Sequence, residues 1–261
     1  MSQPLVSIVM PCRNAEATLG TAVASVLAQD YPNFELLVVD DASSDASILI
    51  ANGFCAQDSR VKLLPNRASN RGASYARNVA LEAARGDLVG FLDSDDTWFA
   101  WALSARIERM QETGAKVVYG PYLRLYPDGT TAVVQPRPSA SYEDMLWKNH
   151  IGNLTGLYDA RALGIEYQSH VPHEDYLMWC KLVKRGGTAA STQDRPLGTY
   201  RVSSKSLSAD KRSAFLWHWN VLRDGLGVPW AKAIALQACY SFDALASRIS
   251  EARRRRAPRS A

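Results

Sequence analysis

The segment Asp87-Leu88-Val89-Gly90-Phe91-Leu92 runs directly into Asp93-Ser94-Asp95-Asp96. A short apolar run of this kind is typical of a buried strand. Three acidic residues follow within four positions. Because burying like charges so close together costs free energy, this strand end must be open to water or hold a cation. We predict a site for Mg²⁺ or Mn²⁺ and a diphosphate here, although an isolated Asp-x-Asp is more often a solvated acidic turn.

Length and composition are those of an ordinary folded protein, and 261 residues can form one large domain or two small ones. The cysteines are scattered without paired spacing, which argues against a zinc site or a disulfide framework and fits a reducing cytosol. We expect no signal peptide, because the first residues lack a basic segment and an apolar core. No run of about 20 apolar residues occurs, so we expect no membrane-spanning helix.

The positive charge is concentrated at the end of the sequence. The formal net charge is +4, but the residues from Arg248 onward carry six arginines against Glu251, a balance of +5. The rest of the chain is therefore near −1. This distribution argues against a nucleic-acid-binding core.

Strands and helices alternate through the first hundred residues. We expect strands at 5–10, 34–39, 61–64 and 87–92, with helices through 19–27, after Ser43-Ser44-Asp45 and over 72–84. This alternation predicts a parallel sheet with helices on both faces. Ligands bind beyond the carboxyl ends of the strands in such sheets. Three polar clusters (Pro11–Arg13, Asp40–Asp41 and Asp93–Asp96) are expected at these ends, which strengthens the metal interpretation.

The pattern changes after a helix expected over 98–112. The sequence predicts a hairpin over 117–134 with an Asp-Gly turn, then a helix capped at Ser141. A short strand is expected at 154–158, a helix from Tyr176 to Lys184 and a last strand at 199–202, followed by two helical segments. We therefore expect one domain with a C-terminal helical appendage.

These pieces together resemble glycosyltransferase family 2, whose fold is called GT-A. The resemblance covers roughly residues 5 to 210. It rests on the order and spacing of several motifs, which are Val6-Ser7-Ile8-Val9-Met10-Pro11-Cys12-Arg13-Asn14, Val38-Val39-Asp40-Asp41-Ala42-Ser43-Ser44-Asp45, Asn70-Arg71-Gly72 through Ala76-Arg77-Asn78, Leu92-Asp93-Ser94-Asp95-Asp96-Thr97-Trp98, Glu174-Asp175 and Tyr200-Arg201. The resemblance implies a Rossmann-like, mostly parallel central sheet with helices on both faces.

The resemblance also implies roles for individual residues. Those expected at the nucleotide sugar are Pro11, Arg13, Glu16, Asp41, Gly72, Arg77, Asn78, Asp93, Ser94 and Arg201. Asp41 would accept a hydrogen bond from the base. Asp95, with Asp93 beside it, would bind Mn²⁺ or Mg²⁺, which would stabilise the leaving diphosphate. Asp175 resembles the catalytic base, which takes the proton of the acceptor hydroxyl opposite the leaving group.

Several of these residues have simpler interpretations. Asp175 is also consistent with a helix N-cap, and Arg77 with a surface partner of Glu82. Asp40 is consistent with a structural role at its strand end. His170 and His173 are expected to be exposed loop residues, with contact to an acceptor phosphate as the alternative.

One position departs from the family pattern. Many relatives have a His just after the Tyr-Arg pair, where it can complete the metal shell, but Val202-Ser203-Ser204 stands here. Metal affinity is thereby put in doubt. Water would fill the gap, and Arg201 with Lys205 would offset diphosphate charge. The segments 149–155 and 200–208 are similar to the subgroup that builds bacterial surface polysaccharides on a lipid carrier.

The C-terminal segment has two interpretations. Apolar residues recur near helical spacing at Trp230, Ile234, Ala238, Phe242, Leu245 and Ile249, before the Arg cluster. Such a helix suits the surface of an anionic membrane, where each basic residue adds about 1 kcal/mol. The alternative is that the stripe packs on the protein itself.

The sequence thus predicts an inverting, metal-dependent glycosyltransferase. It would move a hexose or N-acetylhexosamine from a UDP-sugar to a hydroxyl of a lipid-linked oligosaccharide. We expect a nucleotide-binding half (1–97), an acceptor-binding half (98–210) and C-terminal helices with a basic tail (211–261). The expected location is cytoplasmic, peripheral on the cytoplasmic face of the bacterial inner membrane, with no nucleic-acid partner. The alternatives are a nucleotidyltransferase of related fold and a non-catalytic sugar-nucleotide-binding module.

Overall fold

A computed structural model of the chain describes residues 3–66, 70–202 and 211–241. Its centre is an eight-stranded sheet in the order β3-β2-β1-β4-β10-β6-β11-β9. The predicted alternation is confirmed in its first half, where four strands pair in parallel: β1 (Val6–Cys12), β2 (Phe34–Asp40), β3 (Val61–Pro65) and β4 (Leu88–Phe91). These strands are joined by α1 (Leu19–Leu27), α2 (Ser47–Gln57) and α3 (Ala73–Ala83).

The second half of the sheet is mixed. Its strands are β10 (Leu157–Asp159), β6 (Val117–Tyr119), β11 (Ala189–Ser191) and β9 (Ser139–Ala140). β10 runs antiparallel to both β4 and β6, whereas β11 is parallel to β6. The predicted fold class, an α/β protein with a mostly parallel central sheet, is confirmed.

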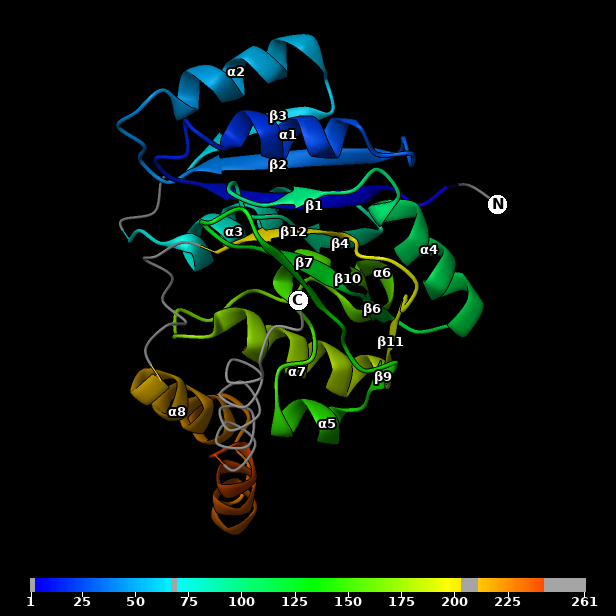
Figure 1. Ribbon diagram of the computed structural model, residues 1–261, viewed down its shortest axis with the longest axis vertical. Coiled ribbons are helices and arrows are strands. Elements are labelled where there is room, and N and C mark those ends of the chain that lie inside the picture. Colours follow the sequence, from blue (N-terminus) through cyan, green and yellow to red (C-terminus); the bar gives the residue numbers. More distant parts are fainter. Residues whose placement is uncertain (1–2, 67–69, 203–210, 242–261) are drawn as a thin grey trace, which may run out of the picture.

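Helices cover both faces of this sheet (Figure 1). Side chains alternate between the faces along each strand, so that Ile8 packs with α1, α2 and α4 (Ala102–Thr113), while Val9 packs with α3, α5 (Tyr142–Trp147) and α7 (Glu174–Gly186). The short helix α6 (Ala160–Leu163) follows β10, and a 3-10 turn, η1 (Asn153–Thr155), precedes it. The predicted cap of α5 is confirmed as a reciprocal pair between Ser141 and Asp144.

A second, four-stranded sheet in the order β5-β12-β7-β8 was not predicted. It consists of β5 (Thr97–Trp98), β12 (Gly198–Arg201), β7 (Tyr122–Leu125) and β8 (Thr131–Val134). The Asp-Gly hairpin is confirmed in β7 and β8, but the strand expected over 117–126 is divided at Gly120-Pro121 between the two sheets. The helix expected from residue 98 begins at Ala102, because Trp98 belongs to β5 and donates from its indole to the carbonyl of Leu154.

The expected end of the first strand at residue 10, before Pro11, is also wrong, since β1 continues to Cys12. The carbonyl of Val9 accepts from Leu92 on the side of β4. Pro11, two residues further, directs its nitrogen to the same side, beyond the end of β4. The proline therefore removes no ladder hydrogen bond.

The C-terminal segment packs below α7 in Figure 1. It comprises α8 (Lys211–Asn220), a π-helical turn η3 (Val221–Gly225) and a helix over 230–241. Buried Leu222, Val228 and Ala233 join it to Leu146 of α5. Within the described residues, no helix is both long enough and apolar enough to cross a membrane.

The described part of the predicted apolar stripe is largely exposed, although the Trp230 ring contacts Trp219 and Arg223. Trp230 and Ile234 are 62% and 57% exposed, and Ala238 is exposed as well. The opposite face of this helix, with Ala233 and Gln237, is buried against the body. Phe242, Leu245, Ile249 and the Arg cluster lie outside the described residues.

Candidate active site

Polar residues from three strand ends meet at the carboxyl edge of the parallel strands. They lie at the end of β1 (Pro11 to Arg13), at the end of β2 (Asp40 and Asp41) and after β4 (Asp93 to Asp96). β1 lies between β2 and β4 in the sheet, so the sequence of strands brings these three ends side by side. A cavity of about 230 Å³ opens there. Its lining includes Pro11, Arg13, Asp41, Gly72, Arg77, Asp93, Ser94 and Asp95.

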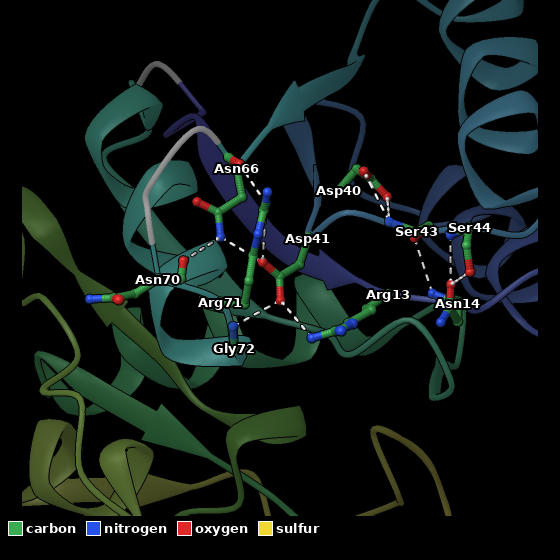
Figure 2. Close-up of polar contacts among 10 residues, drawn as sticks. All are labelled: Arg13, Asn14, Asp40, Asp41, Ser43, Ser44, Asn66, Asn70, Arg71 and Gly72. Atoms are coloured by element: carbon green, nitrogen blue, oxygen red, sulfur yellow. Dashed lines mark hydrogen bonds and ion pairs between the residues drawn. The ribbon is translucent and has the colours of Figure 1, made fainter.

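The carboxylate of Asp41 is the centre of a polar network (Figure 2). It accepts hydrogen bonds from the side chain of Asn66 (2.6 Å) and from the backbone N–H of Gly72 (2.8 Å). Gly72 has a φ of +129°, a conformation that favours glycine, and it directly precedes α3. Arg13 and Arg71 place guanidinium nitrogens 3.8 and 3.9 Å from the same buried carboxylate. Asp41 is thus held firmly at the cavity wall, between two partly exposed cations.

The neighbouring acidic residues have structural partners. Asp40 accepts from the backbone N–H of Ser43, which ties the end of β2 to the following loop (Figure 2). Glu16 accepts from the backbone N–H of Ala46 and does not line the cavity. Asn78 also lies outside it, because its side chain bonds the backbone of Gln168 in both directions. The structure therefore does not bring Glu16 and Asn78 together with the other expected nucleotide-binding residues.

Arg77 is buried at the base of the cavity and is not a surface partner of Glu82. Its guanidinium donates to Asp93 at 2.7 Å and to Glu174 at 3.1 Å. Burial alone lowers the pKa of an arginine, but Asp93 and Glu174 outweigh it and raise the pKa of Arg77 above its ordinary value. Arg77 is therefore a fixed cation between the end of β4 and the start of α7.

The acidic turn after β4 carries charge that these contacts do not fully compensate. Burial and then the nearby Asp93 raise the pKa of Asp95, and the same two effects raise the pKa of Asp96 to about 8. The carboxyl of Asp96 accepts from the backbone N–H of Arg201 at 2.9 Å. The guanidinium of Arg201 also reaches the backbone carbonyl of Asp95, so β12 is joined to this turn.

A larger cavity of about 490 Å³ adjoins the first and shares Arg77 and Asp93 with it. Asp175 lines this second cavity. Glu174 and Asp175 are the first two residues of α7, and the N-cap position belongs to His173, so the simpler interpretation of Asp175 as an N-cap is wrong. Burial and the adjacent Glu174 raise the pKa of Asp175, against the opposing effect of Arg77.

The two histidines near α7 have different surroundings. His173 has a φ of +60°, lines the larger cavity and meets the ring of Trp217 edge to face at 4.9 Å. His170 is exposed and stacks on Tyr75, with ring centroids 3.5 Å apart. The sequence analysis assigned no role to Arg71, Tyr122 or Trp217. Arg71 belongs to a motif that the family resemblance includes, whereas no sequence pattern pointed to Trp217.

The comparison with protein families decides the class. Residues 7–170 match the model described as glycosyl transferase family 2. The chain belongs to this family. Family membership favours glycosyl transfer over the two alternatives, nucleotidyl transfer and a non-catalytic binding module.

Two relatives of this glycosyltransferase align along nearly their whole length. One is "UDP-Glc:alpha-D-GlcNAc-diphosphoundecaprenol beta-1,3-glucosyltransferase WfgD" of Escherichia coli, 36% identical, with 89% of this chain and 90% of the relative covered. The other is "Putative teichuronic acid biosynthesis glycosyltransferase TuaG" of Bacillus subtilis, 33% identical, with 95% and 98% covered.

Solved structures share the fold of the glycosyltransferase. Staphylococcus aureus TarS 1–349 in complex with UDP-GlcNAc superposes with a TM-score of 0.70 at 20% identity and covers 90% of this chain and 71% of TarS. The mannosyltransferase PcManGT of Pyrobaculum calidifontis, in complex with GDP-Man and Mn²⁺, gives a TM-score of 0.66 at 17% identity, with 92% and 70% covered.

The carboxylates at the site of the glycosyltransferase fit a hard divalent cation whose other ligands come from the substrate and water. Among the residues that the structure describes, no group of three or more His, Cys, Asp and Glu side chains is arranged to hold a metal. Asp93 and Asp95 offer two carboxylates, and the pKa of Asp95 is raised first by burial and then by the nearby Asp93, whose charge a cation would offset. Mg²⁺ sites commonly consist of one or two carboxylates completed by water and phosphate oxygens.

Proposed function

We propose that the enzyme transfers glucose from UDP-glucose to the N-acetylglucosamine of a polyprenyl-diphosphate-linked acceptor. The observation that carries this proposal is the 36% identity to WfgD over nearly the full length of both proteins. The two adjoining cavities support it, because one can hold a nucleotide and the other an acceptor, with Arg77 and Asp93 between them. More broadly, we infer a UDP-sugar as donor and a lipid-linked saccharide as acceptor.

The smaller cavity would bind the nucleotide. Asp41, fixed by Asn66 and Gly72, would accept from the uracil, and Arg13 beside it would pack on the base. Asp93 and Ser94 would contact the ribose, and Pro11 and Gly72 would form the wall. Arg77 would stay with Asp93 and neutralise it, and Arg201 would offset the charge of the diphosphate.

Asp95, assisted by Asp93, would hold Mn²⁺ or Mg²⁺. When bound, the cation supplies positive charge to the departing diphosphate. The protein itself would hold the donor in place for transfer. Val202 follows Tyr200-Arg201 at the position where the family resemblance implied a histidine, so the metal shell would rely on water and phosphate oxygens.

Asp175 would be the catalytic base. It lines the acceptor cavity, and its raised pKa makes it a better proton acceptor than an exposed aspartate. UDP-glucose carries its sugar in α linkage, and the name of WfgD specifies a β product. A single displacement, with Asp175 opposite the leaving UDP, would give this inversion.

The C-terminal helices would dock the enzyme on an anionic membrane, on the cytoplasmic face of the bacterial inner membrane. An open apolar groove of about 470 Å³ lies between α8 and the 230–241 helix, lined by Phe215, Leu216, Trp219, Ile234 and Ala238. The sequence beyond it carries the Arg cluster from 248 to 259, whose charge is complementary to anionic lipid headgroups. A bilayer is the proposed occupant, because the proposed acceptor is anchored in one.

We propose that these roles are divided among the three expected parts of the chain. Residues 1–97 supply most of the nucleotide cavity, and residues 98–210 supply most of the acceptor cavity. Residues 211–261 would form the membrane-docking part.

The test is incubation of the purified enzyme with a panel of nucleotide sugars, Mn²⁺ and a short-chain GlcNAc-diphosphate lipid. We expect release of UDP from UDP-glucose and a disaccharide product whose new bond is β. Release of pyrophosphate would indicate nucleotidyl transfer. Binding of UDP-glucose without turnover by any acceptor would favour a binding module and refute the proposal.

A further inference from the structure

Trp217 lies outside the segment that matches the family model, yet it reaches the acceptor cavity. The matching segment ends at residue 170, whereas Trp217 belongs to α8 in the C-terminal part of the chain. Its side chain lines the same cavity as Asp175 and His173. The family's shared sequence therefore does not account for this wall of the site.

The position of the Trp217 ring is fixed from two directions. His173 meets it edge to face, with ring centroids 4.9 Å apart and planes at 71°. The next residue, His218, is buried and anchors α8, because its Nε2 bonds the carbonyl oxygen of Leu146 at 3.2 Å and its Nδ1 bonds Gln237 at 2.7 Å. The ring of His218 also stacks on Tyr240 at 4.4 Å. Trp217 is thus a rigid element of the cavity wall.

The remaining lining of the cavity has the composition of a sugar site. Tyr122 and Tyr200 of the second sheet line the cavity together with the acidic residues, and their rings are packed edge to face at 6.3 Å. Aromatic faces offer apolar contact to the C–H face of a sugar ring, while carboxylates accept hydrogen bonds from its hydroxyls. The cavity contains both kinds of group in one space of about 490 Å³.

We propose that Trp217 is a binding residue for the acceptor sugar, stacking against the ring whose hydroxyl faces Asp175. This inference rests on the proposed function, which assigns the acceptor to the larger cavity. It deepens that function by placing an acceptor-specificity residue in α8. Trp217 does not line the nucleotide cavity, so its contribution falls on acceptor binding and not on UDP-glucose.

The test compares Trp217→Ala and Trp217→Phe with Trp147→Ala, a matched control. Trp147 ends α5, is 43% exposed and lines neither cavity. We expect Trp217→Ala to raise the KM for a short-chain GlcNAc-diphosphate lipid at least about tenfold. The KM for UDP-glucose and the slow transfer of glucose to water should be unchanged, and Trp217→Phe should recover part of the loss. An unchanged acceptor KM in Trp217→Ala, or an equal rise in both KM values, would refute the inference.

A second measurement separates this inference from the proposed function. Saturation-transfer difference NMR with methyl N-acetyl-α-glucosaminide, in the presence of UDP, reports acceptor contact without turnover. Signal in the unmodified enzyme and Trp147→Ala, lost in Trp217→Ala, would support the subsite even if UDP-glucose proved not to be the donor. Equal signal in all variants, or no signal in the unmodified enzyme, would overturn it while leaving glucosyl transfer intact.

Discussion

The guanidinium of Arg77 lies 2.7 Å from the carboxylate of Asp93, and this ion pair forms the wall that the two cavities share. The same guanidinium reaches Glu174, the residue before Asp175. One buried cation therefore connects the proposed donor side to the proposed acceptor side.

Replacement of Arg77 by Met should lower both stability and activity. Breaking a buried ion pair leaves uncompensated charge and costs roughly 3–5 kcal/mol, and we expect about 3 because Asp93 and Glu174 keep some contact with water. For a domain of this size that is a fall in Tm of roughly 6–12 °C. The control is Arg85→Met, because the side chain of Arg85 is 70% exposed in its ion pair with Glu35. Equal Tm values for the two variants would contradict the buried role of Arg77.

Asp175→Asn should abolish transfer and leave UDP binding intact. The amide keeps the size of the side chain but cannot accept the acceptor proton, and loss of a general base typically costs about 10²- to 10⁴-fold in rate. The measurements are kcat with the acceptor and, separately, the shift in Tm produced by UDP with Mn²⁺. Turnover above about a tenth of the normal rate would remove Asp175 from the role of base.

The pH dependence of kcat/KM should reflect the raised pKa of Asp175. A base acts only when deprotonated, so activity should fall as the pH drops through this pKa, at a higher pH than for an ordinary exposed aspartate. Glu174→Gln removes the neighbouring charge that raises the pKa, and the acidic limb should then move to lower pH. If the fall of kcat/KM at low pH occurs at the same pH in Glu174→Gln, a group other than Asp175 controls it.

Removal of the metal with EDTA should stop UDP release, and Mn²⁺ should restore it. We also expect UDP and Mn²⁺ together to raise Tm more than the sum of their separate effects, because the cation would bridge Asp95 and the diphosphate. Asp95→Asn should lose this synergy. Asp194→Asn, at an exposed aspartate that lines neither cavity of the site, should retain it. Full synergy in Asp95→Asn would exclude Asp95 as a ligand.

The exposed face of the C-terminal helices should carry membrane binding. In flotation with vesicles containing anionic lipid, Leu216→Ser/Ile234→Ser should partition less than the unmodified protein, since both side chains are more than half exposed in the apolar groove. Tyr167→Ser, at an exposed aromatic residue outside this groove, is the control. Partitioning that is equal in all three proteins would end the membrane proposal.

The sequence predicted the parallel half of the fold well because its signals are local. Each strand there is a short, mainly apolar run, and β1 lies between β2 and β4, so Asp41 and Asp93 could be placed at one edge. The second sheet was missed because it is assembled from distant short strands. β5, for example, contains two residues whose partner, β12, is a hundred residues away.

The candidate site shows the same limit. Asp41, Asp93 and Asp95 follow strands, and their common cavity could be expected from topology. The ion pairs of Arg77 with Asp93 and Glu174 depend on side-chain geometry across 16 and 97 residues, which no spacing rule supplies. Glu16 and Asn78 occupy family positions, but their side chains are committed to backbone groups of this chain.

The two faces of α8 limit how far the enzyme can reach. Trp217 projects into the larger cavity, while Phe215 and Leu216 line the groove proposed to rest on lipid. A helix with its side chains is only about 10–12 Å across. A saccharide bound at Trp217 would therefore sit just above the headgroups, where the first sugar on a carrier is found and the tip of a long glycan is not. This spacing would restrict the enzyme to an early step of chain assembly.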